Sequence, residues 1–266
     1  MEPRETLAAL HDFCVERFGA ELTPRIVSLA RPGFDLRRAE PGEGSGHCRF
    51  GGRAMLEPGT PWPTCEDDPL SLFAVLDTDV LAPWLGDLAP AGTGLLNFFY
   101  LDDIGLAFEP EAVAVIAARS GHAVEIDPPA ESKVFAPVAW KAESGFAMPD
   151  GYDAAWEEIL DDVEYDTYEY ISDYVRIGNT ESDWLWARPG VLTSGEIAFG
   201  WPMLPGTVSQ NFPDGEDPNS FHHLLQLSDQ GEWHMEGEGG WMHWSIPTQA
   251  LSHCQQPAFT LGDSCL

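Results

Sequence analysis

The first predicted element is a helix, because apolar positions recur with helical spacing over residues 4–18. Its apolar face comprises Leu7, Leu10, Phe13, Cys14 and Phe18. We expect this amphipathic helix to end before Pro24, since proline lacks the backbone donor that a helix interior requires. The following stretch, residues 31–63, is rich in Gly and Pro, which predicts turns and short extended pieces.

Four later segments have the apolar runs or the alternation typical of β-strands. They are Leu70–Leu76, Gly94–Leu101, Ala112–Ala117 and Lys133–Trp140. Asp77, directly after the first of them, predicts an N-cap for a short helix over Val80–Leu85. Asp153 likewise predicts the start of a helix over residues 154–164, whose apolar face consists of Trp156, Ile159, Leu160 and Val163.

Three segments of the first half resemble three segments of the second half in the same order. They are Phe50–Leu56 with Phe199–Leu204, Ala74–Asp77 with Leu224–Asp229, and Gly94–Tyr100 with Gly240–Ile246. Each half alone would leave one sheet face uncovered, so the two faces are expected to form one core. The sequence therefore predicts an α+β fold, internally duplicated, in which mixed or antiparallel sheets from two similar halves form one globular unit with a few helices. The alternative is a chance similarity between strands rich in Gly and Trp.

This organisation divides the chain into four parts. They are an N-terminal helix and lead-in (1–30), a first repeat lobe (31–150), an acidic linker helix region (151–185) and a second repeat lobe (186–266). The linker region differs from the lobes in composition, because Asp153–Asp173 contains nine acidic residues and neither Lys nor Arg.

The charge of the whole chain is strongly negative. Thirteen Lys and Arg stand against 44 Asp and Glu, which gives a formal net charge of −31. Such a field repels nucleic acids and anionic membranes, so neither is an expected partner. Two interpretations remain open: a compositional bias of the coding sequence, or an acidic surface for a basic partner. In the second, the candidate surface residues are Glu157, Glu158, Asp161 and Asp162.

The cysteines and the N-terminal sequence point to the cytoplasm. The N-terminal residues Met1–Glu5 lack the basic and apolar regions of a secretory signal, and no apolar run is long enough to cross a membrane. Five cysteines occur without a Cys-x-x-Cys spacing, which favours free thiols in a reducing compartment.

Several of these segments resemble the YwqG-like family of unknown function. The resemblance rests on Arg49–Gly52, Leu56–Pro63, Gly94–Tyr100, Gly200–Pro202, Leu224–Leu227 and Gly237–Ile246, and it covers about residues 48–262. Three positions depart from the family pattern: Ala54 replaces Pro, Val75 replaces Gln and Glu238 replaces Asp. The resemblance implies a duplicated α+β fold and no settled activity. It also implies a neutralising or binding role of the kind found beside bacterial toxin–immunity genes.

Motifs for covalent or nucleotide chemistry are missing from the sequence. It has no Gly-x-Ser-x-Gly, no phosphate loop and no Gly-x-Gly-x-x-Gly followed by a helix, and it has only two lysines. Imidazoles and carboxylates between residues 222 and 243 suit a metal, and His234 and Glu236 would share one face of a strand. Because no established ligand spacing accompanies them, they are weak candidates, and we expect no cofactor.

A ligand pocket between the lobes is a further candidate site. Its candidate residues are Arg49, Trp62, Gln226, Glu238 and Trp241. Indole rings beside glycines offer flat apolar platforms for a sugar, peptide or base, although aromatic rings also simply fill cores. The leading hypothesis is a non-enzymatic protein-binding module, such as an immunity-type or accessory protein with a basic partner or toxin. The alternative is an enzyme or ligand-binding protein that acts on a small molecule or peptide in this pocket, with or without a metal.

Overall fold

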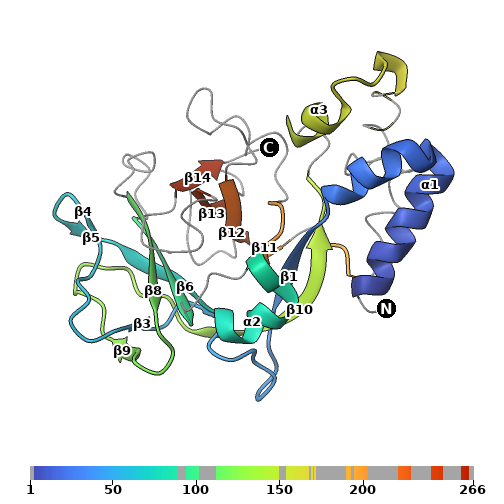
Figure 1. Ribbon diagram of the computed structural model, residues 1–266. Coiled ribbons are helices and arrows are strands. Elements are labelled where there is room, and N and C mark those ends of the chain that lie inside the picture. The colour runs from blue at the N-terminus through green and yellow to red at the C-terminus, as the bar shows by residue number, and fades with distance from the viewer. Residues whose placement is uncertain are drawn as a thin grey trace.

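The computed structural model describes residues 3–88, 94–101, 112–149, 154–167, 169, 171, 190–192, 195–202, 221–228, 241–247 and 259–263. These residues form a mixed α+β structure in which one large, mostly antiparallel sheet curls around an apolar core (Figure 1). The α+β class predicted from the sequence is therefore confirmed.

Helix α1 spans Pro3–Ser28 and contains a break at Gly19, whose φ of 83° and ψ of 163° are not helical. The first part agrees with the predicted helix over residues 4–18, since the break follows at Gly19. The expectation that Pro24 would stop any continuation is wrong, because a second helical part runs to Ser28. Pro24 lies close to the start of the second helical part, where the loss of one backbone donor is better tolerated than in a helix interior. The side chain of Thr23 strengthens this start, because its hydroxyl donates to the carbonyl of Gly19 at 2.8 Å.

The large sheet has ten described strands in the order β14-β13-β12-β11-β1-β10-β2-β6-β7-β8. Their bounds are β1 Arg31–Arg38, β2 Arg49–Phe50, β6 Ser71–Asp77, β7 Leu95–Tyr100, β8 Val113–Ala118, β10 Val138–Ala147, β11 Ile197–Phe199, β12 Phe221–Ser228, β13 Trp241–Pro247 and β14 Phe259–Asp263. Three predicted strands correspond to β6, β7 and β8. The fourth is misplaced: β10 begins five residues later than Lys133 and continues to Ala147.

Strand β1 lies at the centre of the sheet, although the sequence predicted only short extended pieces there. It pairs with β10 over its whole length and with β11 through Gly33, Phe34 and Asp35. Its Pro and Gly do not prevent this, because Pro32 lies at the start of the strand and Gly33 allows β11 to approach closely. A Cβ atom on Gly33 would lie 2.9 Å from the carbonyl oxygen of Ala198.

The strand order is symmetrical about the central strands β1 and β10. The strands β2, β6, β7 and β8 follow on one side, and β11, β12, β13 and β14 follow on the other. The registers correspond as well. Val75 pairs with Asn97 as Gln226 pairs with His243, and both hairpins shift register, between Leu72 and Ala74 and between His223 and Leu225. The segments predicted to be repeated thus occupy corresponding positions, and the duplication itself stays a prediction.

One buried apolar cluster contains residues of both halves. The Trp244 ring of β13 lies 6.0 Å from the Phe73 ring of β6 and 5.6 Å from the Phe98 ring of β7. The edge strands β8 and β14 also contact each other, so the curled sheet nearly closes on itself (Figure 1). Burial of aromatic rings from both halves on one side of the sheet holds this curvature.

Shorter elements cover the first half of the sheet. Helix α2, Thr78–Leu85, has the predicted N-cap Asp77, whose carboxylate accepts from the Val80 N–H; the 3₁₀ helix η1, Gly86–Leu88, follows. Two small antiparallel pairs join β3 (Ala54–Leu56) to β9 (Val124–Ile126) and β4 (Thr64–Cys65) to β5 (Asp68–Pro69). The buried side chain of Asn97 attaches β3 to the large sheet, since it accepts from the Met55 N–H at 2.7 Å and donates to the Met55 carbonyl at 2.8 Å.

Helix α3 spans Ala154–Leu160, so it ends four residues before the predicted position, and Asp161 and Asp162 follow in a turn. Its buried residues Trp156 and Leu160 belong to a second apolar cluster, which also contains Leu10, Cys14 and Ile26 of α1. Helices α1 and α3 therefore share one core with Phe146 and Ala147 of β10 and Ile197 of β11. The two helices lie at one end of the molecule (Figure 1).

Candidate functional site

Arg49 is held by the backbone around it. It lies on β2, and its guanidinium donates to the carbonyl oxygens of His47 at 3.3 Å and Arg53 at 2.5 Å. Burial lowers the pKa of Arg49, and the charge of Glu125 acts in the opposite direction. These contacts hold the loop between β2 and β3 in place. Arg49, which we predicted from the sequence to bind a ligand, therefore has a structural role in this loop.

The other predicted pocket residues lie on separate strands. Trp62 packs edge-on against Phe99 with ring centroids 5.1 Å apart, and its indole N–H donates to the Leu70 carbonyl at 2.8 Å. Gln226 is buried on β12 and donates to the Gly195 carbonyl at 3.1 Å. Trp241 is the first residue of β13, and Glu238 lies outside the described residues. Strands β11, β1 and β10 lie between Gln226 on β12 and Arg49 on β2 in the sheet order.

The predicted metal candidates His234 and Glu236 also lie outside the described residues. Within the described part of the chain, no three His, Cys, Asp or Glu side chains are grouped so that they could hold a metal ion. Two buried thiols there are also poorly suited to nucleophilic chemistry. Burial raises the pKa of Cys14 to about 12 and that of Cys48 to about 11, which keeps both sulfurs protonated at neutral pH.

Two adjacent histidines on β12 are kept neutral by their surroundings. His223 is fully buried, and its Nδ1 lies 3.1 Å from the Phe199 carbonyl oxygen. Burial, the larger cause, and the nearby positive charge of Arg31 together lower the pKa of both His222 and His223 to about 4, although two backbone hydrogen bonds act in the opposite direction at His223. Arg31 itself lies over the Trp201 ring, 3.5 Å from the centroid, so a second cation there would be poorly tolerated.

The folded protein should therefore begin to lose stability at mildly acidic pH. Both histidines have a lower pKa in the folded state than the ordinary value of 6.5, so the unfolded chain binds more protons between pH 6.5 and about 4. We expect the free energy of unfolding to fall as the pH decreases through this window. The check is urea unfolding at a series of pH values for the wild type and His222→Gln/His223→Gln. The free energy of unfolding of the variant should depend less steeply on pH than that of the wild type. Identical slopes would contradict the role assigned to the two histidines.

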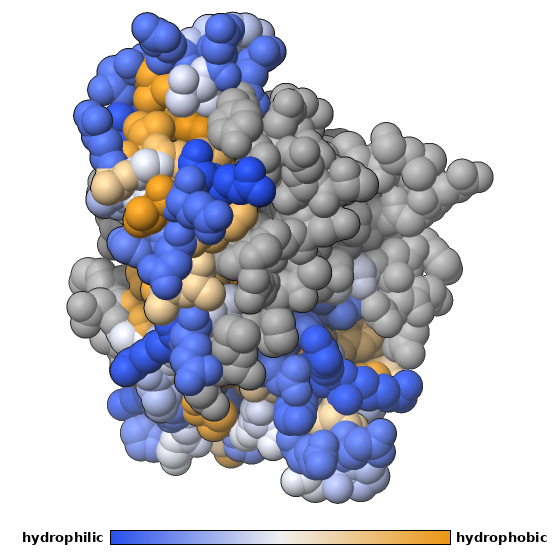
Figure 2. Space-filling view, turned by 90° about the vertical axis from the view of Figure 1, so that its right-hand side faces the viewer, coloured by the Kyte–Doolittle hydropathy of each residue, from blue (hydrophilic) through white to orange (hydrophobic). Residues whose placement is uncertain are grey.

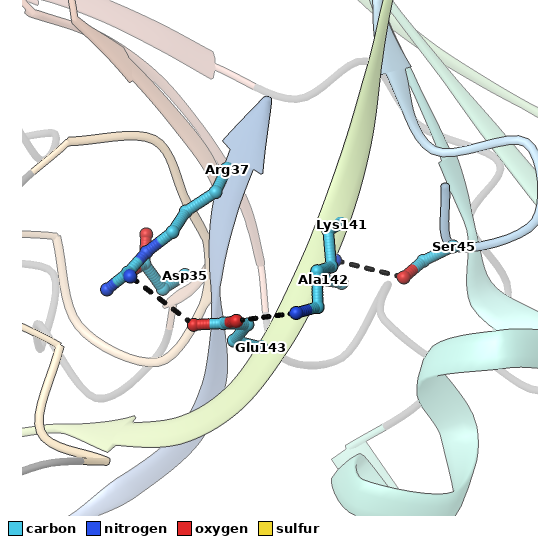
Figure 3. Close-up of polar contacts among 6 residues, drawn as sticks. All are labelled: Asp35, Arg37, Ser45, Lys141, Ala142 and Glu143. Atoms are coloured by element: carbon cyan, nitrogen blue, oxygen red, sulfur yellow. Dashed lines mark hydrogen bonds and ion pairs between the residues drawn. The ribbon is translucent and has the colours of Figure 1, made fainter. Parts of the chain in front are cut away.

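Charged residues on the two central strands form a balanced group (Figure 3). In the register of β1 and β10, Asp35 lies opposite Glu143 and Arg37 lies opposite Lys141, so like charges face each other. Two contacts along the strands and one diagonal contact between them relieve this repulsion. Arg37 approaches Asp35 at 2.7 Å and Glu143 at 3.5 Å, and Lys141 approaches Glu143 at 3.1 Å. Two positive and two negative charges cancel here, so the group aligns the strands and leaves no net charge for a partner.

Beside this group, Ser45 forms hydrogen bonds with the part of β10 that has no neighbouring strand on this edge among the described residues. The Ser45 hydroxyl accepts from the Ala142 N–H at 3.0 Å (Figure 3). The Ser45 N–H donates to the Trp140 carbonyl at 2.8 Å. Strand β2 pairs with β10 only at Val138 and Ala139, so these two bonds continue the edge where β2 has ended. They shield backbone groups that would otherwise be open to another strand.

A different surface carries uncompensated charge. We define the α1–α3 surface as part of α1, with Phe13 and Phe18, together with residues 159–169. Its exposed acidic residues are Asp161, Asp162, Glu164, Asp166 and Glu169. Among the described ion pairs, Arg25 of α1 is the base that meets this group, with its guanidinium 2.7 Å from Asp162 and 3.8 Å from Asp161. Its hydrogen bond holds the pKa of Asp162 below the usual range.

Apolar side chains lie beside these carboxylates. Phe13 and Phe18 are partly buried against the second apolar cluster, with ring centroids 6.2 Å apart in an edge-on arrangement, and Ile159 and Val163 are partly buried from the α3 side. Tyr165 is 70 % exposed, and its hydroxyl donates to Glu169 at 2.6 Å. Figure 2 shows hydrophobic residues gathered at this end of the molecule and bordered by hydrophilic ones.

The sequence anticipated only part of this surface. Asp161 and Asp162 were candidate partner residues, and both are exposed; Glu157 and Glu158 lie on α3 itself. Arg25 was missed because the helix was expected to stop before Pro24. A signal for it existed in the chain: the spacing of Leu22 and Ile26 continues the apolar face of α1 beyond the proline.

Comparison with known proteins adds one finding. A model of a domain of unknown function, DUF1963, matches residues 48–260. None of the curated proteins matches the chain significantly. In the described part of the chain, no helix is both long and apolar enough to span a bilayer. The matched segment includes α3 and most of the large sheet but neither α1 nor β1.

Proposed function

This chain belongs to the DUF1963 family of domains of unknown function, and we propose that it is a non-enzymatic protein-binding module with a basic partner. In this proposal it acts in the cytoplasm as an accessory or immunity-type protein, as the YwqG-like resemblance implies. The observation that carries the proposal is the α1–α3 surface, where five exposed carboxylates border partly buried aromatic and aliphatic side chains.

The charge distribution supports this choice of surface. Three arginines elsewhere in the described residues each pair with an acid: Arg37 with Asp35, Arg53 with Asp127, and Arg119 with Glu57. The segment after α3, residues 161–167 and 169, carries five exposed acids, and Arg25 is the base that pairs with them among the described ion pairs, so this segment retains a local negative charge. Screening limits such a charge to about 8 Å at physiological salt, so a basic partner feels it most strongly on approach to this surface.

The apolar residues give the same surface a source of affinity. Exposed charges alone contribute little to binding, because each pair is screened and gains about 0–1 kcal/mol. Aromatic side chains that become fully buried in an interface contribute far more, and a polar rim around them is the usual anatomy of a binding surface. Tyr165, whose hydroxyl donates to Glu169, provides this combination next to the carboxylates, together with the partly buried Ile159 and Val163.

The test removes negative charges from this surface with substitutions that keep the size and shape of each side chain. The variant is Glu157→Gln/Glu158→Gln/Asp161→Asn/Asp162→Asn, and the matched control, Glu40→Gln/Glu43→Gln/Asp67→Asn/Glu131→Gln, removes four exposed charges from the first half of the chain. A basic protein captured from the source cells at low salt is purified and titrated against both. We expect the α3 variant to bind at least about tenfold more weakly, with a flatter salt dependence, and the control to lose about threefold or less.

Two results would contradict the proposal. Equal losses in the α3 variant and the control would mean that only the total charge matters. The second result is a capture that yields no basic protein, or a purified candidate that binds both variants as tightly as the wild type. In that case the negative charge of the chain would reflect its amino-acid composition alone. Circular dichroism of each variant establishes that the helices are retained.

A further inference from the structure

Strand β2 connects β10 to β6 in the large sheet with only two residues. Arg49 and Phe50 pair with two residues of β10 on one side and with two residues of β6 on the other. By contrast, β1 and β10 pair over the eight residues of β1. The loop before β2 lies beside this short connection, and we call its residues 42–47 the strap.

Hydrogen bonds attach the strap to both strands that β2 connects. On the side of β10, the Ser45 N–H donates to the Trp140 carbonyl at 2.8 Å, and the Ser45 hydroxyl accepts from the Ala142 N–H at 3.0 Å (Figure 3). On the side of β6, the His47 N–H donates to the carboxylate of Asp77, the last residue of this strand, at 3.1 Å. The strap therefore forms a second link between β10 and β6.

The buried carboxylate of Asp77 holds the strap and helix α2 at the same point. Its Oδ1 accepts from the Val80 N–H at the start of α2, and its Oδ2 accepts from the His47 N–H of the strap. Gly46 fits directly against this carboxylate. Its φ is +55°, and a Cβ atom there would overlap with Asp77 Oδ2 and with the Val80 side chain. The position of the strap thus depends on a residue without a side chain next to Asp77.

The strap has little else to keep it closed. All of its residues except Ser45 are exposed, and none of them belongs to either of the two apolar clusters. A segment without buried apolar contacts opens at a lower free energy than the buried strands beside it. We infer that the strap opens and closes as one unit over the edge of β10, and that the contact of Gly46 and His47 with Asp77 holds it closed. The strands and α2 stay folded when it opens.

Hydrogen exchange of the wild-type protein, followed by NMR, tests the opening. The Ala142 N–H is bonded to the strap, whereas Lys141 and Glu143 direct their backbone groups to the other edge of β10, where β1 pairs. We expect the protection factor of Ala142 to agree with that of His47 within about threefold. It should be at least about 30-fold lower than those of Lys141 and Glu143. Equal protection of Ala142, Lys141 and Glu143 would overturn the inference, because the strap would then open only together with the sheet.

Two glycine substitutions test the role of Asp77. Gly46→Ala places a methyl group against the carboxylate, and Gly42→Ala is the matched control, since Gly42 also has a positive φ, +86°, but has no atom within 4 Å of an added Cβ. Both variants carry the cost of a left-handed backbone, so their difference reports the contact with Asp77. We expect Gly46→Ala to lower the protection of Ala142 at least about tenfold more than Gly42→Ala does, with Lys141 unchanged in both. Equal effects of the two variants would overturn the role of Asp77. The comparison within β10 needs only the wild type, so it does not depend on the folding of either variant.

Discussion

Replacing Trp244 with alanine is expected to lower the free energy of unfolding by about 3–5 kcal/mol. The Trp244 side chain is fully buried between the two halves of the sheet, in contact with the Phe73 and Phe98 rings. Its indole N–H also donates to the Phe99 carbonyl at 3.3 Å. Removing the ring leaves a large cavity where β13 meets β6 and β7, and urea unfolding followed by circular dichroism measures the loss.

Two substitutions serve as references for this change. Trp244→Phe keeps an aromatic ring in the cluster but loses the N–H donor, so it should cost about 1–2 kcal/mol. Val134→Ala removes apolar atoms from a side chain that is 62 % exposed and should change stability by less than about 0.5 kcal/mol. A Trp244→Ala protein within 1 kcal/mol of the wild type would show that the two halves do not depend on a common core.

Asn97→Leu should destabilise the protein by roughly 2–5 kcal/mol, because it leaves buried backbone groups without partners. The Asn97 side chain accepts from the Met55 N–H and donates to the carbonyls of Met55 and Ile116, at 2.7, 2.8 and 3.1 Å. Leucine has a similar volume, so the change removes the three bonds without creating a large cavity. Hydrogen exchange at Met55 and equilibrium unfolding provide the measurements.

Asn97→Asp tests the same contacts through pH. An aspartate keeps the acceptor for the Met55 N–H, and in its protonated form it can also donate one bond. Burial raises the folded-state pKa of such a carboxyl above its unfolded value of about 3.9, so the folded state binds more protons. Stability relative to the wild type should therefore be greatest at low pH and fall as the pH rises. An Asn97→Leu protein as stable as the wild type, or a pH-independent Asn97→Asp, would contradict the role assigned to Asn97.

Elements with a strong local signal were predictable from the sequence. Strands β6, β7 and β8 are nearly continuous apolar runs, and β6 and β7, which are fully buried within the sheet, have the composition typical of such strands. The start of α2 was predictable because the Asp77 side chain can accept from a helix N–H only three residues away. In each case the deciding interactions lie within a few residues or on one face of one element.

Elements decided by distant parts of the chain were not predictable in this way. The sequence of β1, Arg31–Arg38, contains three arginines, one aspartate, Pro and Gly, which resembles a loop. It becomes a central strand because β10 and β11 supply partners on both edges and because Glu143 and Lys141 balance its charges. The effect of Pro24 was misjudged for a related reason: the break at Gly19 starts a new helical segment, and the packing of Ile26 confirms the continuation that its spacing from Leu22 indicates.

The acidic character of the candidate surface was predictable from the sequence, but the other residues that contribute to it were not. The acidic residues stand out in the sequence, whereas their position beside Phe13 and Phe18 depends on the packing of α3 against α1. Arg49 and Trp62 were identified from a family resemblance and from residue type. Their polar groups are engaged by nearby backbone carbonyls, a role that residue type alone does not distinguish from ligand binding.

The position of β1 has a consequence for where the folding unit begins. The segment that matches the family starts at residue 48, whereas β1 ends at Arg38 and lies between β10 and β11 in the sheet. A chain cut at the family boundary would expose two facing rows of unpaired backbone groups in the middle of the sheet, and such rows are templates for aggregation. The segment that matches the family and the segment that completes the sheet therefore differ, and the second includes β1, Arg31–Arg38.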